Sequence, residues 1–258
     1  MSALTPSAPA VPHQPARVDL VRWFYPASAA ALLVGTIVGF QLFYFHGRSH
    51  PGRPIPPPIR TLIIVHGVAM SAWMLLMVLQ PTLVALRKRK LHMAIGKVGV
   101  GLAAAIVVLG VLVGVRSAQV TPPELILWTL TPKQFLAVPL GAVLLFGAMV
   151  GIAVWKRRKP IAHRAMMLSA TLMILPAAIS RIDALSGLYA GTDWERLCGP
   201  YLATMALGVL LLAVRCALTR SFDRWLAGGV GVLNVTSLAT MANARTGAWD
   251  AFASLVVS

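Results

Sequence analysis

The chain has 258 residues, of which 58% are hydrophobic and 12% are charged. The charged share is about half that of a typical soluble domain, which excludes an ordinary soluble enzyme, a disordered chain and a disulfide-stabilised scaffold. Lys and Arg number 23 against 7 Asp and Glu, so the formal net charge is +16. A membrane protein with basic cytoplasmic loops explains the apolar composition and the charge together. No nucleic-acid-binding motif accompanies that charge, so we expect no nucleic-acid partner.

Apolar runs long enough to form membrane-spanning helices recur along the chain. A spanning helix needs about 20 mostly apolar residues, and seven segments meet or approach this length. They are residues 27–45, 61–86, 98–115, 135–155, 165–180, 197–214 and 225–242. The fifth is short, and the seventh is the weakest because it is rich in glycine and contains Asn234. The sequence predicts an all-α bundle of about seven transmembrane helices, with residues 27–244 as the transmembrane domain.

The segments outside the spans have distinct compositions. Residues 1–26 are rich in Pro, Ala and Ser, which is typical of a disordered tail. Residues 46–60 are rich in Pro and are expected to form a stiff, extended external segment. Residues 245–258 form a C-terminal tail, which is either a surface helix or a continuation of the last span.

The basic residues alternate between the loops. With the N-terminus in the cytoplasm, the inner segments hold most of the basic residues and only two acids, Asp19 and Asp223. The positive-inside rule favours this orientation, and we expect a multi-pass protein of a bacterial inner membrane whose inner face attracts anionic lipids. These inner basic residues are Arg17, Arg22, Arg87, Lys88, Arg89, Lys90, Lys97, Lys156, Arg157, Arg158, Lys159, Arg164, Arg215, Arg220 and Arg224.

Glycines one helical turn apart occur three times in the spans. Small residues at this spacing allow helix backbones to approach closely. We expect them to pack helices within the monomer, with a homodimer face as the alternative. The pairs are Gly35/Gly39, Gly110/Gly114 and Gly147/Gly151.

Polar side chains within a span are candidates for a functional site because their burial in the membrane is costly. His66, Trp73 and Gln80 are seven residues apart and therefore share one face of the second span. This stripe either contributes to a site or simply faces neighbouring helices and is hydrogen-bonded there.

Two further histidines, His92 and His163, lie at the inner boundary at the starts of the third and fifth spans. Neutral imidazole is the usual axial ligand of haem iron, and two such ligands at one depth could hold one haem or metal ion. Arg87 and Arg164 lie nearby in the sequence and could pair with haem propionates. Glycines at positions 96 and 99 are expected to leave room for the flat ring. Alternatively, both histidines only reach lipid headgroups at the interface.

His66 belongs to a different place, because about 20 helical residues put it about 30 Å from the inner end of its span. An outer site there would hold a second cofactor or a quinone headgroup. The expected neighbours of His66 in that site are Arg116, Gln119, Arg181 and Asp183.

The sequence lacks the residues that several other membrane-protein functions require. The last predicted span has no Lys to carry retinal, and the chain has no His-Glu-x-x-His, no Cys-x-x-Cys-His and no Gly-rich phosphate loop. Every Asp and Glu falls at a boundary or in a loop, which argues against a proton- or sodium-coupled transporter.

Two blocks of the chain resemble bacterial polytopic membrane proteins of unknown function. The first block runs from His66 through Gln80 and Arg87 to His92 and Gly96, and the second runs from Lys159 through His163, Arg164, Met166 and Met167 to Arg181. Met93 departs from the pattern, which has a basic residue there. The recurring histidines are loosely similar to those of transmembrane b-type cytochromes. The resemblance implies a role for the three histidines, and it implies no reaction.

The leading hypothesis is a b-cytochrome-like redox protein that binds haem b or a metal ion through His92 and His163. A second hypothesis is a non-catalytic accessory or assembly subunit that docks on other membrane proteins or on a second copy. A third is a permease for a small solute, with Thr36, Gln80 and Asn234 along its path.

Overall fold

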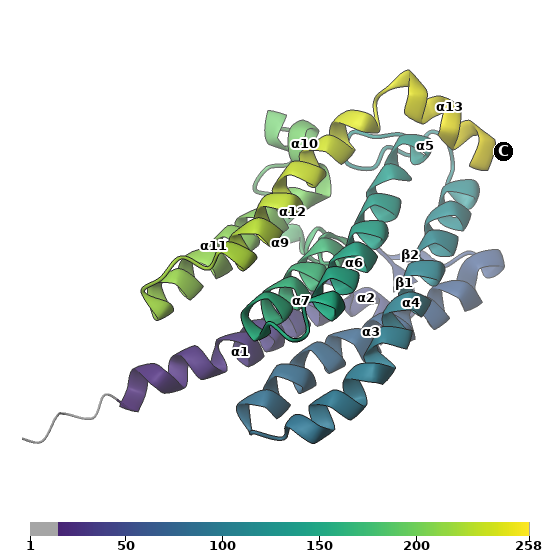
Figure 1. Ribbon diagram of the computed structural model, residues 1–258. Coiled ribbons are helices and arrows are strands. Elements are labelled where there is room, and N and C mark those ends of the chain that lie inside the picture. Colours follow the sequence, from purple (N-terminus) through teal and green to yellow (C-terminus); the bar gives the residue numbers. More distant parts are fainter. Residues whose placement is uncertain (1–14, 258) are drawn as a thin grey trace, which may run out of the picture.

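The computed structural model describes residues 15–257. Within this part of the chain, seven helical segments are long and apolar enough to cross a membrane, in agreement with the predicted all-α bundle. Figure 1 shows the long helices packed beside one another in one bundle. They are α1 (Pro15–Gly39), α3 (Pro57–Ala85), α4 (Arg89–Val120), α6 (Ala137–Trp155), α7 (Pro160–Ile174), α11 (Leu202–Thr219) and α12 (Arg224–Asn243).

Short elements extend or connect the long helices. The C-terminal helix α13 packs on α5, and the indole nitrogen of Trp249 donates to the Lys133 carbonyl at 3.0 Å. The predicted C-terminal tail is therefore largely a separate helix and does not continue the last span. The short elements are α2 (Gln41–His46), β1 (Arg48–Ser49), β2 (Arg53–Pro54), α5 (Pro132–Phe135), α8 (Pro176–Ile179), α9 (Asp183–Ser186), α10 (Asp193–Cys198), η1 (Gly199–Tyr201) and α13 (Gly247–Val256).

Several helices begin earlier than the apolar runs predict. The prediction of a disordered tail is wrong for residues 15–26, which belong to α1, because Phe24 and Tyr25 are buried in the core. Residues 1–14, the rest of that predicted tail, lie outside the described residues. Helices α4 and α7 begin at Arg89 and Pro160, ahead of the predicted starts at 98 and 165. A search for apolar runs misses these first turns because they contain Lys and Arg, whose long side chains extend from the helix to water.

The proline-rich segment 46–60 turns back on itself and is not fully extended as predicted. Strands β1 and β2 pair antiparallel, with Ser49 opposite Arg53. Gly52 in the connecting turn has a φ of 114°, which glycine adopts without steric cost. The backbone pairing therefore folds this segment into a short hairpin.

Helix α7 lies at the centre of the bundle, although its apolar run is one of the weakest. It contacts α6, α12, α3, α1 and α11. Its span is Pro160–Ile179, and 72% of the most apolar 18-residue stretch of this span is buried inside the protein. Its side chains are small or apolar on several faces, including Ala165, Leu168 and Leu172. A span surrounded by protein needs less hydrophobicity than a span surrounded by lipid, which explains the weak signal.

The glycine pairs mostly pack helices within the monomer, as predicted. A Cβ at Gly39 would overlap the backbone of Ala178 in α8, and a Cβ at Gly147 would lie 2.9 Å from Val107 in α4. Gly35, Gly110 and Gly114 likewise face side chains of other helices. Gly151 has no atom within 4 Å of its Cβ position. These glycines therefore set close helix contacts inside the bundle.

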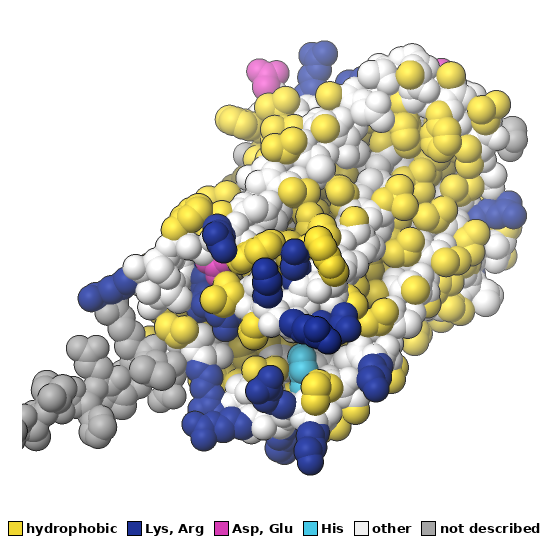
Figure 2. All heavy atoms as spheres, viewed as in Figure 1, with side chains coloured by type: hydrophobic (Ala, Val, Ile, Leu, Met, Phe, Trp, Pro, Cys, Tyr) yellow, Lys and Arg dark blue, Asp and Glu magenta, His cyan; other side chains and the backbone are white. Residues whose placement is uncertain are grey.

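The surface is apolar along its flank and basic at one end. Leu75, Val98 and Val235 are among the apolar side chains that are 60% or more exposed, as expected for a lipid-facing flank. Figure 2 shows Lys and Arg gathered where α3 turns into α4 and where α6 turns into α7. We call this end of the bundle the basic end and the other the opposite end.

Candidate functional site

The two boundary histidines come together at the basic end. His92 lies in the first turn of α4 and His163 in the first turn of α7, and both are half-buried. Their ring centroids are 6.3 Å apart and their planes are 85° apart. They meet because the α3–α4 and α6–α7 hairpins pack side by side and turn at the same end (Figure 1).

A backbone carbonyl holds the His163 ring. Its Nδ1 lies 2.8 Å from the carbonyl oxygen of Ala153, near the end of α6. A carbonyl only accepts hydrogen bonds, so Nδ1 of His163 carries the proton and donates it. The neutral ring then keeps a free lone pair on Nε2, which is the tautomer that binds a metal ion.

Gln80 of α3 holds the His92 side of the pair. The oxygen and nitrogen of its amide are assigned from their hydrogen-bonding partners. In this assignment the oxygen accepts from the Gly96 backbone nitrogen at 3.1 Å, and the nitrogen donates to the His92 carbonyl at 3.2 Å. These two bonds set the orientation of the amide, which also turns its nitrogen to Nδ1 of His92. His92 therefore accepts at Nδ1 and carries its proton on Nε2. The predicted polar stripe thus faces inward at Gln80, and it does so at Trp73, whose indole donates to Thr171 at 3.3 Å.

The separation of the two ring centroids is similar to that of two imidazoles on one metal ion. Metal–imidazole bonds of about 2.0 Å on each side put the two ring centroids roughly 6 Å apart. The observed separation is 6.3 Å, and rotation about each metal–nitrogen bond permits perpendicular rings. Among the side chains that the structure describes, residues 20–257, no group of three or more His, Cys, Asp or Glu is placed to hold a metal, so no third ligand of these types joins the two histidines.

The predicted space for a haem ring beside the glycines is filled. A Cβ at Gly99 would lie 2.6 Å from a methyl group of Leu76, and the nearest atom to a Cβ at Gly96 is the Gln80 amide at 3.9 Å. The prediction that these glycines open a slot is therefore wrong at Gly99, because the neighbouring helix α3 fills it. A haem held by the two histidines would have to lie toward the basic end, away from Gly99.

The two predicted propionate partners point to different places. Arg87 is exposed in the α3–α4 turn, where its φ of 62° is left-handed. Arg164 lies with its guanidinium carbon 5.2 Å from the ring centroid of Tyr25. Arg87 remains available at the basic end, whereas Arg164 packs against α1.

The structure does not assemble the predicted outer site around His66. Arg116 donates to Gln119 at 3.0 Å, and Gln119 donates to the C-terminal helix α13 at the Val256 carbonyl. Asp183 lies 3.7 Å from His50. The His66 ring is half-buried and its Nδ1 has no hydrogen-bond partner among the described residues.

Arg181, the remaining expected neighbour of His66, packs against Phe40, which lies between α1 and α2. Its guanidinium carbon lies 4.8 Å from the Phe40 ring centroid, and Nη1 donates to the Ala177 carbonyl. Burial lowers the pKa of Arg181 to about 10, so the side chain stays positively charged at neutral pH.

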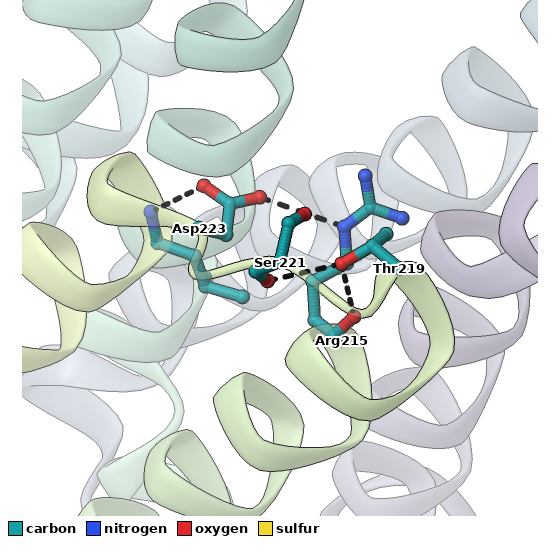
Figure 3. A network of polar contacts seen from close by, with 5 residues as sticks. Arg215, Thr219, Ser221 and Asp223 are labelled. Atoms are coloured by element: carbon teal, nitrogen blue, oxygen red, sulfur yellow. Dashed lines mark hydrogen bonds and ion pairs between the residues drawn. The ribbon is translucent and has the colours of Figure 1, made fainter.

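A buried ion pair at the basic end was missed by the sequence analysis. Nε of Arg215 donates to Oδ2 of Asp223 at 3.5 Å, and both side chains are 5% exposed. Asp223 also caps α12, because Oδ1 accepts from the Leu226 backbone nitrogen at 3.1 Å (Figure 3). Arg215 had been placed in a loop, whereas α11 continues to Thr219 and carries it inside. The N-cap position of Asp223, just ahead of the seventh apolar run, was the available signal.

Aromatic rings of α1 cover this ion pair. The guanidinium carbon of Arg215 lies 5.5 Å from the Phe24 ring centroid and 5.4 Å from that of Tyr25. Each distance is within the range of a cation–π contact. The segment predicted as a disordered tail therefore helps to shield the charges of α11 and of the α11–α12 turn.

Two of the three residues proposed for a permeation path are hydrogen-bonded within the bundle. Thr36 donates to the Leu32 carbonyl at 2.8 Å within its own helix, and Gln80 is engaged by His92. The Asn234 side-chain oxygen is buried without a partner among the described residues. A cavity of about 10 Å³ between α6, α7 and α12 has room for about one water molecule, and none of these three residues lines it.

The basic end brings together two imidazoles, each of which is oriented by a second group. His163 presents a free Nε2 lone pair, whereas His92 needs its other tautomer to bind a metal through Nε2. His92, His163 and Gln80 are the predicted site residues that meet there. Comparison with protein-family models, with curated proteins and with solved structures finds no match for this chain.

Proposed function

We propose that this membrane protein is a b-cytochrome-like redox protein in which His92 and His163 would hold one haem iron. The observation that carries the proposal is the 6.3 Å separation of the two rings, which come from different helical hairpins. A bound haem would supply one-electron oxidation and reduction. We place the basic end on the cytoplasmic side of a bacterial inner membrane, in accordance with the positive-inside rule.

The charges around the histidines favour haem over a bare cation. Arg87, Lys88, Arg89 and Lys90 connect α3 to α4 or begin α4, and Lys159 directly precedes α7. A bare divalent ion would be repelled by these cations, whereas the two carboxylates of haem would be attracted. Both histidine rings are half-buried at the basic end, so the carboxylates of a haem bound there could reach the basic side chains.

Gln80 is the positioning residue of the site. With the amide assigned from its hydrogen bonds, its nitrogen donates to Nδ1 of His92, so Nε2 bears the proton and cannot bind a metal. Ligation through Nε2 requires that the Nε2 proton leaves and that Nδ1 becomes protonated. The Gln80 amide must then turn so that its oxygen accepts from Nδ1. A hydrogen-bond acceptor behind a ligating histidine orients the ring and raises its basicity.

The first experiment compares optical spectra and metal content of the purified wild-type protein with those of His92→Ala and His163→Ala, all produced with ample haem supply. We expect sharp reduced-minus-oxidised bands at about one haem per chain in the wild type and loss of the bands in both variants. His46→Ala is the matched control, because His46 is exposed at the opposite end. A colourless wild type, or full haem retention in both variants, would refute the proposal. Metal without haem bands would replace haem by a bare ion.

A second experiment isolates the role of Gln80. Gln80→Glu introduces a carboxylate, which only accepts hydrogen bonds. His92 should therefore carry its proton on Nδ1, bind the iron through Nε2 and release haem more slowly. Gln80→Leu removes the acceptor and should weaken binding by about 10- to 100-fold, the usual cost of losing such a partner. The readout is the rate of haem transfer to an acceptor protein, together with the reduction potential. Equal rates in the two variants would show that Gln80 only fills space.

A further inference from the structure

A second site lies at the opposite end of the bundle, where α10 meets the end of α12. A cavity of about 350 Å³ opens there on the surface. It is lined by Asp193, Arg196 and Leu197 from α10, by Leu238 and Ala242 from α12, and by Arg245 just beyond α12. None of these residues contributes to the histidine site.

The cavity has an excess of positive charge. It contains two guanidinium groups and one carboxylate, and neither arginine forms an ion pair with the side chains described, those of residues 20–257. Burial lowers the pKa of Arg245, and the nearby positive charge of Arg196 lowers it further. Two cations that face one cavity without a paired acid favour an anion between them.

Hydrogen bonds hold one of these arginines in place. Arg245 donates through Nη1 to the Met241 carbonyl at 2.7 Å and through Nη2 to the Thr129 hydroxyl at 2.8 Å. Arg196 is exposed, and its side chain has no hydrogen bond to other described residues. One guanidinium is therefore preorganised, which lowers the entropic cost of binding, and the other is free to close on a ligand.

The remainder of the cavity is apolar and lies at the membrane surface. Leu197 is 53% exposed and Leu238 is 36% exposed, and both belong to spanning segments. The neighbouring Trp194 is 59% exposed on the short helix α10. Exposed Trp at the end of a span is typical of the membrane–water interface. A ligand of this cavity therefore meets cations at headgroup depth and apolar side chains below them.

We infer that the cavity binds an anionic membrane phospholipid, with its phosphate between Arg196 and Arg245 and an acyl chain along Leu238 of α12. The planar guanidinium of arginine can donate two hydrogen bonds to two oxygens of one phosphate, which favours a phosphate over a chloride ion. The apolar lining favours a lipid over free phosphate, because a small anion would leave Leu197 and Leu238 uncovered.

The test measures lipid binding to the delipidated, detergent-solubilised protein by native mass spectrometry with phosphatidylglycerol, phosphatidylcholine or inorganic phosphate. We expect phosphatidylglycerol to bind more tightly than phosphatidylcholine. Loss of one interfacial cation costs about 1 kcal/mol, so Arg196→Gln should weaken binding about fivefold. Ala242→Trp should weaken it by filling the cavity while both charges remain. Arg48→Gln, which removes an exposed arginine of the hairpin outside the cavity, should bind like the wild type.

Arg196→Gln and Ala242→Trp both change exposed side chains, so the fold should tolerate them, whereas Arg245 also holds the backbone. Equal binding of the two lipids, or unchanged binding in both variants, would overturn the inference. Competition by inorganic phosphate at the same concentration would also overturn it, because the site would then hold a free anion.

Discussion

Removal of the Asp223 charge should destabilise the protein strongly. The contact between Arg215 and Asp223 is 3.5 Å long, and both side chains are 5% exposed. Two unit charges at that distance attract by about 5 kcal/mol at an effective dielectric constant of about 20. Loss of one partner of a buried pair typically costs about 3–5 kcal/mol because the other charge remains buried. We expect a loss of this size for Asp223→Asn, since Asn still caps the helix.

The double variant separates the charge effect from packing. Arg215→Met removes the stranded cation and keeps an unbranched side chain of similar length beside Phe24 and Tyr25. The double variant of Asp223→Asn with Arg215→Met should therefore recover most of the loss seen in Asp223→Asn alone. Arg224→Gln is the matched control, because Arg224 is exposed next to Asp223 and should change stability by about 0.5 kcal/mol or less.

Thermal unfolding in one detergent, followed by tryptophan fluorescence, is the assay. Each kcal/mol shifts the midpoint by roughly 2–4 °C in a domain of this size, so Asp223→Asn should lower it by roughly 6–20 °C. The reasoning fails if Asp223→Asn unfolds within about 1 °C of the wild type. It also fails if the two single losses simply add in the double variant, because then the charges do not interact.

Two further perturbations test helix packing and a pH dependence. Gly39→Ala should destabilise the protein by about 1–3 kcal/mol because its Cβ would overlap the Ala178 backbone. Gly151→Ala is the control and should be neutral or stabilising, because its Cβ meets no atom within 4 Å. Equal thermal unfolding midpoints of the two variants would contradict this packing. Burial lowers the pKa of His50 below its usual 6.5, and Asp183 opposes this effect, so Asp183→Asn should lower the pKa further, as measured by NMR of the ring protons. The unfolded chain then binds more protons just below pH 6.5, so stability falls as the pH drops through that window, and His50→Gln should flatten this dependence. A His50 pKa at or above 6.5 would contradict this prediction.

The sequence alone was enough to predict the seven helices and the candidate histidines. Membrane helices can be predicted locally, because each must bond its own backbone and present a long apolar surface to lipid. The same reasoning drew attention to polar residues near the spans, including His92, His163 and Gln80. It also predicted that the glycine pairs pack within the monomer, since small residues at helical spacing serve backbone contact.

Tertiary structure decided which of these residues meet. Contacts between hairpins bring His92 to His163. Packing of α3 against α4 within one hairpin turns Gln80 onto His92 and fills the space beside Gly99 with Leu76. None of these contacts follows from spacing along one helix, because each depends on how two helices are rotated against each other.

Burial of charge was equally invisible in the sequence. Hydropathy assigned Arg215 and Asp223 to a loop because both are charged, yet they lie inside the bundle where each neutralises the other. Their burial depends on Phe24 and Tyr25, which belong to a segment that looked like a tail. Burial of a charge in a membrane protein costs much less when an opposite charge lies nearby, and for this pair that proximity exists only once α1, α11 and α12 have packed together.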